Sequence, residues 1–134
     1  MKKLLGLFLL SCFAACSPTS DSERKIRNVQ GCWFVDQKNA GGQEYRGVLN
    51  LAQSGSGFQG MLDWENHQIG AASGTVFGDS MSFQVTYPSL PNLVGMYSGI
   101  LDGGGEKILQ GKAKSNGNDS STWIAAKTAC PADK

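Results

Sequence analysis

Very few side chains in this chain of 134 residues have the types and spacing that catalysis requires. His67 is the single histidine, and the spacing identifies no nucleophile or orienting group to pair with it. Asp63 and Glu65 lie two apart, on one face of an extended strand, where two carboxylates suit acid–base work or cation binding. We interpret them as solvated charges near a strand end, and His67 as a loop residue. We therefore predict no enzyme, no catalytic residue, no metal site and no cofactor.

The N-terminus has the layout of a secretory signal. Two lysines precede an apolar run that is too short to span a bilayer. Two alanines stand directly before Cys16, and this arrangement resembles a bacterial lipobox, whose cysteine is acylated with lipid such as palmitate after the bond before it is cut. The resemblance implies a signal peptide over 1–15 and lipidation of Cys16. The alternatives are a lipobox that ends at Cys12 and an ordinary cleaved signal.

Two cysteines remain once Cys12 leaves with the signal and Cys16 takes the lipid. In an oxidising compartment an even pair favours a disulfide, here Cys32–Cys130. The bridge would close a loop of about 100 residues, for which the chain-entropy model gives on the order of 4–5 kcal/mol. Two free buried thiols are the alternative. Two lone cysteines and one histidine do not make a four-ligand zinc set.

Polar residues without apolar periodicity fill the segment 16–28. This composition predicts a lipidated tether, followed by one domain over 29–134. The alternative for the C-terminal part of this tether is a short helix around 23–28. Ser17, rather than an aspartate, follows the lipidated cysteine. The resemblance to sorted lipoproteins then implies the outer membrane of a bacterial cell envelope, with the domain facing the periplasm or the cell surface.

The charge balance excludes a nucleic-acid partner. The chain has 12 basic and 11 acidic residues, and loss of the two signal lysines leaves ten basic residues against eleven acidic ones. A near-neutral domain lacks the basic surface that nucleic acid requires, and it also lacks a polybasic stretch for attachment to a membrane by charge.

Short runs with period-two alternation, separated by glycine-rich turns, predict an all-β domain. The sequence Gly55–Gly60 matches a dinucleotide fingerprint in form, but it alternates like a strand and reads as a glycine hairpin. Pro88 and Pro91 mark a loop over 87–94, because proline cannot donate to a ladder. The predicted strands are 31–37, 45–53, 57–64, 68–77, 80–87, 93–101, 106–114 and 120–129.

Eight short antiparallel strands predict a closed up-and-down β-barrel, since closure removes the two exposed edges. The start of the first strand and the end of the last strand then lie side by side. If Trp33 and Trp123 point inward, Cys32 and Cys130 both point outward at this seam, where a disulfide is geometrically reasonable.

The same alternation predicts which side chains fill the interior. In three of the predicted strands the apolar residues lie clearly on one face, whereas in 68–77, 93–101 and 106–114 they do not. The predicted inward residues of the three clear strands are Tyr45, Leu49, Leu51, Phe58, Leu62, Trp64, Met81, Phe83, Val85 and Tyr87.

The opening Gly31-Cys32-Trp33 resembles the Gly-x-Trp at the head of lipocalins and of avidin-like barrels. The resemblance implies a lipocalin-like (calycin-like) fold and ligand binding. It also implies that Trp33 packs across the closed end near a basic residue on the last strand, a role that falls to Lys127 or to no residue.

Taken together, these patterns predict an envelope lipoprotein whose barrel binds a small apolar ligand without catalysis. Aromatic side chains either line a small pocket or fill the barrel. The predicted ligand-binding residues are Trp33, Tyr45, Trp64, Phe83, Tyr87 and Trp123. A module that binds another envelope protein, such as a lysozyme or protease inhibitor, is the alternative function.

Overall fold

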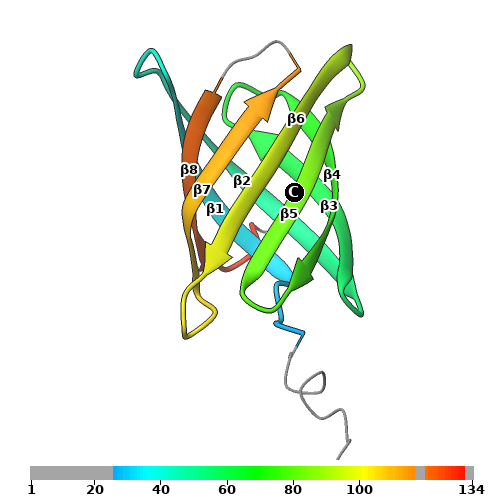
Figure 1. Ribbon diagram of the computed structural model, residues 1–134. Coiled ribbons are helices and arrows are strands. Elements are labelled where there is room, and N and C mark those ends of the chain that lie inside the picture. The colour runs from blue at the N-terminus through cyan, green and yellow to red at the C-terminus, as the bar shows by residue number, and fades with distance from the viewer. Residues whose placement is uncertain (1–25, 117–119, 132–134) are drawn as a thin grey trace, which may run out of the picture.

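The computed structural model describes residues 26–116 and 120–131. These residues form a closed barrel of eight antiparallel strands in chain order, with β1 paired to both β2 and β8 (Figure 1). The predicted all-β, eight-stranded up-and-down barrel is therefore confirmed. The strands are β1 (Gly31–Asn39), β2 (Glu44–Ser54), β3 (Gly57–Trp64), β4 (Ile69–Phe77), β5 (Ser80–Tyr87), β6 (Leu90–Leu101), β7 (Lys107–Ser115) and β8 (Ser120–Thr128).

The predictions for the signal peptide 1–15, for lipidation of Cys16 and for most of the tether fall outside the described residues. Within the part that the structure describes, no helix is long and apolar enough to cross a membrane.

The largest difference from the predicted strands is at the start of β6. Leu90 still pairs with Tyr87, so β6 begins three residues earlier than position 93. The register then shifts, because the next pair is Thr86 with Val94, and residues 91–93 bulge out of the ladder. Pro91 lies in this bulge, where no ladder hydrogen bond is required of it.

Alternation sends one face of each strand into a single core. Nine of the ten predicted inward side chains are buried, and the tenth, Tyr45, is half-buried at one end of the barrel. The outward partners, such as Gln59 and Gln84, are exposed. The interpretation of Gly55–Gly60 also holds, since residues 55 and 56 form the turn between β2 and β3.

The strands that showed no clear face carry small residues at their inward positions. Gly70, Ala72 and Gly74 of β4 point inward, as do Gly99 of β6 and Gly111 of β7. A Cβ atom on Gly74 would lie 2.4 Å from the Cβ of Phe83, and one on Gly99 would lie 2.6 Å from Ile108. These glycines make room for large neighbours, and for that reason hydrophobicity alone did not mark their faces.

The barrel closes where β1 meets β8, and a disulfide lies at this seam. Cys32 pairs in register with Thr128, and its sulfur is bonded to that of Cys130, with 5.1 Å between the two Cα atoms. Trp33, the next residue, is fully buried in the interior. The predicted bridge at the closing seam is therefore present.

One end of the barrel is closed by the segment that precedes β1. Val29 is fully buried, and its carbonyl oxygen accepts a hydrogen bond from Nε1 of Trp33 at 2.9 Å. The amide of Val29 donates to Oε1 of Gln53 at 2.7 Å, and the side-chain amide of Gln53 donates to the carbonyl of Arg27 at 2.8 Å. The last residues of the predicted tether therefore belong structurally to the barrel.

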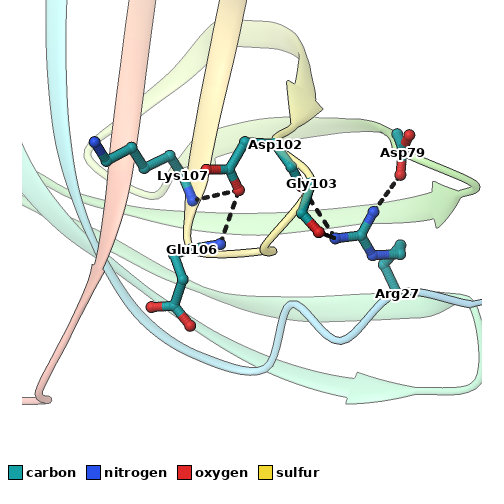
Figure 2. A network of polar contacts seen from close by, with 6 residues as sticks. All are labelled: Arg27, Asp79, Asp102, Gly103, Glu106 and Lys107. Atoms are coloured by element: carbon teal, nitrogen blue, oxygen red, sulfur yellow. Dashed lines mark hydrogen bonds and ion pairs between the residues drawn. The ribbon is translucent and has the colours of Figure 1, made fainter.

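Arg27 links this segment to two turns of the closed end (Figure 2). Its guanidinium forms an ion pair with Asp79 in the β4–β5 turn. It also donates to the carbonyl oxygens of Asp102 and Gly103, at 3.0 and 3.3 Å, in the β6–β7 turn. The carboxylate of Asp102 in turn accepts the amide of Glu106 at 3.0 Å, which holds that turn in shape.

Candidate functional site

The opposite end of the barrel is open. An antiparallel meander places alternate turns at alternate ends. The β1–β2, β3–β4 and β5–β6 turns therefore surround this mouth together with the end of β7 and the start of β8, and the segment before β1 leaves from the other end (Figure 1). A cavity of about 240 Å³ lies inside the mouth. The cavity is smaller than the roughly 300–1,000 Å³ typical of sites for drug-sized ligands, so it suits a small molecule.

Aromatic side chains form one side of this cavity. Inward side chains of β2, β3, β5 and β6 contribute, namely Tyr45, Trp64, Tyr87 and Tyr97. The first three are near the mouth ends of their strands, whereas Tyr97 lies deeper along β6. Leu93, in the bulge of β6, completes this side and packs against the core. The bulge therefore has a local role, because it brings an apolar side chain to the rim.

Hydrogen bonds hold these rings in place. Nε1 of Trp64 donates to the hydroxyl oxygen of Tyr87 at 2.8 Å, and the hydroxyl of Tyr97 donates to Oε1 of Gln37 at 2.8 Å. Tyr45 contacts Trp64 edge-on, with 6.3 Å between the ring centroids. The aromatic side is therefore ordered without a ligand, and binding would cost little side-chain entropy.

Below the cavity the barrel is filled with rings. Tyr97 stacks on Phe83 with 4.9 Å between the centroids and an interplanar angle of 7°. Trp123 meets Phe83 and Tyr97 edge-on, at 5.7 and 5.8 Å. Tyr97 is thus the floor of the cavity, and the two alternatives for the aromatic residues both apply, at different depths of the same barrel.

The two buried phenols of the cavity remain neutral over the physiological pH range. Burial raises the pKa of Tyr97, and the neighbouring phenol of Tyr87 raises it further. Burial also raises the pKa of Tyr87, although the hydrogen bond from Trp64 opposes part of that shift. Neither hydroxyl therefore presents a negative charge to a ligand.

The six predicted ligand-binding residues separate into three groups. Tyr45, Trp64 and Tyr87 line the cavity. Phe83 and Trp123 lie beneath it, in the ring cluster of the core.

Trp33 lies at the opposite, closed end, away from the cavity. Nζ of Lys127 lies 5.4 Å from the centroid of the Trp33 ring. This is the placement that the Gly-x-Trp resemblance implied for these two residues.

Several cavity residues were not among the predicted ligand contacts. Gln37 lies two residues after Val35 and four after Trp33, which are both inward positions. The alternation of the first strand therefore predicts that Gln37 also points inward. Tyr97 and Gly95 are on β6, whose face was not clear. Ser121 lies on β8, two residues before the inward Trp123, and its small polar side chain gave no signal.

The residues considered for catalysis lie outside this cavity. His67 is in the β3–β4 turn with a φ of 72°, and its side chain is exposed. Asp63 and Glu65 are also exposed, as predicted. Among the residues that the structure describes, no group of three or more His, Cys, Asp or Glu side chains is placed to hold a metal ion.

Comparison with known proteins identifies the fold alone. No family model and no curated protein matches the sequence. Solved structures of designed barrels do match. A redesigned β-barrel has a TM-score of 0.61 and 19% identity, over 75% of this chain and 91% of its own. The redesigned barrel mFAP1, bound to DFHBI, has a TM-score of 0.60 and 19% identity, over 74% and 94%. EF1p2_mFAP2b, also bound to DFHBI, has a TM-score of 0.61 and 18% identity, over 75% and 94%.

Proposed function

We propose that this protein is an envelope-anchored lipoprotein whose β-barrel binds a small molecule, without catalysis, in the cavity at its open end. The observation that carries the proposal is the division of the interior. The lower part is packed with interlocking rings, whereas the mouth keeps a cavity of about 240 Å³ whose aromatic wall is already ordered. A core that served stability alone would gain by filling this space.

The likeness to designed barrels supports the proposal at the level of shape. Two of those barrels are described as bound to DFHBI, so a closed barrel of this size has room for a small ligand. At 18–19% identity the likeness says nothing about which ligand this chain takes.

The position of the N-terminal segment supports an orientation of the site relative to the membrane. Ile26 and the residues after it lie at the closed end, where Ile26 pairs with Gly78 in the β4–β5 turn. The nine residues between Cys16 and Ile26 give ten Cα–Cα steps, which span at most roughly 35 Å. In a chain that is lipidated at Cys16, the closed end is therefore the membrane-proximal end. The mouth then faces the aqueous compartment, from which the ligand would enter.

Native mass spectrometry of the mature protein, purified from the envelope of its own host, tests ligand binding. We expect an added mass of a few hundred daltons or less. The variant Ala113→Leu fills the cavity from an inward position of β7 and should lose this mass, while Lys112→Leu, on the outer face of the same strand, should keep it. Ser121→Leu is a second cavity-filling variant. A bare mass for the wild-type protein would contradict the proposal and favour the alternative, a surface that binds another protein.

Fractionation tests the anchor separately. The variant Cys16→Ala should move the protein from the membrane fraction to the soluble fraction, because lipidation requires that thiol. Cys12→Ala is the matched control and should remain with the membranes. Unchanged fractionation of Cys16→Ala would remove lipidation of Cys16 from the proposal but leave the ligand site intact.

A further inference from the structure

The cavity at the mouth has two chemically different sides. The aromatic side lies on β2, β3, β5 and β6, as described above. The facing side is built from small and polar inward side chains of β7, β8 and β1, namely Ala113, Ser121 and Gln37. A ligand in this space would meet ring faces on one side and hydrogen-bonding groups on the other.

Glycine makes room for one ring of the aromatic side. Gly95 lies at an inward position of β6, two residues before the floor residue Tyr97, and it lines the cavity. A Cβ atom at this position would lie 3.0 Å from the Tyr97 ring. The absence of a side chain at Gly95 therefore leaves room for the Tyr97 ring, so the floor beside it is formed by an aromatic ring.

The polar side offers a hydrogen-bond donor at a defined place. The side-chain oxygen of Gln37 accepts the hydroxyl of Tyr97, so the amide is oriented and its nitrogen is the group left for a ligand. Within the described residues, Nε2 of Gln37 has no other partner. Asn39 also uses its side-chain oxygen, for the amides of Gly41 and Gln43 in the β1–β2 turn.

No ionised side chain points into the cavity from the described residues that line it. Among these described lining residues there is no aspartate, glutamate, arginine or histidine. Its one lysine, Lys114, is exposed and lies between the inward positions Ala113 and Ser115. The phenols of Tyr87 and Tyr97 stay protonated because burial raises their pKa values. A charged ligand would lose its hydration here without gaining a partner charge.

We infer that the ligand class is a flat, uncharged aromatic or heteroaromatic molecule that carries a hydrogen-bond acceptor on its edge. The ring packs against Trp64 and Tyr97, and the acceptor meets Nε2 of Gln37. This inference rests on the proposed function and sharpens it, because an extended aliphatic chain would use neither the ring faces nor the amide.

Calorimetric titration with four matched probes tests the inference. The probes are 2-quinolone, which is flat, neutral and carries a carbonyl; 2-decalone, its saturated and puckered counterpart; 2-naphthoate, which is flat but anionic; and 1-decanol, an aliphatic chain. Each is titrated into the mature protein as purified from its host, and a protein-free blank with the same detergent subtracts partitioning. We expect 2-quinolone to bind at least tenfold more tightly than the other three.

Two variants locate the contact. Gln37→Leu keeps the size of the side chain but removes the amide, and it should weaken 2-quinolone binding about tenfold, which corresponds to about 1.4 kcal/mol. Gln43→Leu, in the exposed β1–β2 turn, is the control and should leave the affinity unchanged. Equal losses in both variants would overturn the assignment of Gln37.

The outcomes distinguish this inference from the proposed function. If 1-decanol or 2-decalone binds as tightly as 2-quinolone and Ala113→Leu abolishes that binding, the site is real but the ligand class is wrong. The ligand class is also wrong if no probe binds while a copurified mass is lost in Ala113→Leu. If 2-quinolone binds and Ala113→Leu does not affect it, binding lies elsewhere and both claims fail.

Discussion

At the scale of single residues, the cavity depends on side chains that are fixed by one another. Tyr97 shows this most clearly, since it stacks on Phe83, donates to Gln37 and forms the floor of the cavity. Its phenol is also a reporter of folding, because burial raises its pKa above the ordinary value of 10.0.

We therefore predict that stability falls at alkaline pH. Below about pH 10 the phenol is protonated in both states, so its contribution is fully present. Above that pH the unfolded chain releases the proton while the folded chain retains it, and stability falls as pH rises. Urea unfolding at a series of pH values measures this. Tyr97→Phe should cost about 1 kcal/mol at neutral pH, from the lost hydrogen bond, and yet show a shallower alkaline fall. An equally steep fall in the variant would contradict the assignment to Tyr97.

At the scale of elements, the strands differ in how they hold the core. β3 and β5 contribute large inward side chains, whereas β4, β6 and β7 also have glycines at inward positions that make room for such neighbours. The glycines of these strands are therefore part of the packing. In β7 the register also shifts between Ile108 and Gly111, so Leu109 and Gln110 are both exposed.

Adding a single methyl group tests the role of the inward glycines. Gly74→Ala would place a Cβ atom 2.1 Å from the carbonyl oxygen of Ser82, so the strand must shift, and we expect a loss of about 1–3 kcal/mol. Gly103→Ala is the control, because its added Cβ atom has nothing within 4 Å, and it should change stability by less than about 0.5 kcal/mol. Urea unfolding compares the two variants. Equal effects would show that close packing at Gly74 does not limit the barrel.

The segment before β1 behaves as an element of the barrel even though it is not a strand. Arg27→Met removes contacts to two turns at once, and we expect it to lower the free energy of unfolding by about 1–2 kcal/mol. We also expect faster proteolytic cleavage before β1. Lys38→Met removes an exposed ion pair to Glu44 at 3.7 Å and should have almost no effect. Arg27→Met with wild-type resistance to proteases would show that Val29 and Gln53 are sufficient to hold the segment.

At the scale of the whole molecule, the barrel separates its two ends. The closed end holds the N-terminal segment, and the seam of β1 and β8 is held by both a hydrogen-bonded ladder and the disulfide. The mouth is left without such covalent support, and the candidate site is at that end.

We predict that the disulfide contributes strongly to stability, because it joins residues that are 98 positions apart. The chain-entropy model gives roughly 4–5 kcal/mol for a loop of that size. Urea unfolding with and without reductant measures the contribution. The double variant Cys32→Ser with Cys130→Ser should match the reduced wild-type protein and should not respond to reductant. A loss below about 1 kcal/mol would show that the β1–β8 ladder closes the barrel without help.

The sequence by itself determined the strand count, the closure and the disulfide. Period-two alternation and glycine turns are local signals, and they predict the strands. Cys32 and Cys130 stand at the two ends of the meander, so a closed barrel accommodates both the eight strands and the disulfide. Only the tertiary structure decided which aromatic residues line a cavity and which fill the core. Trp33, Phe83 and Trp64 have the same inward parity, but their depth along the barrel differs, and depth depends on the stagger of all eight strands. The inward faces of β4, β6 and β7 were hidden for a related reason. Their glycines are buried by the size of their neighbours and not by their own hydrophobicity.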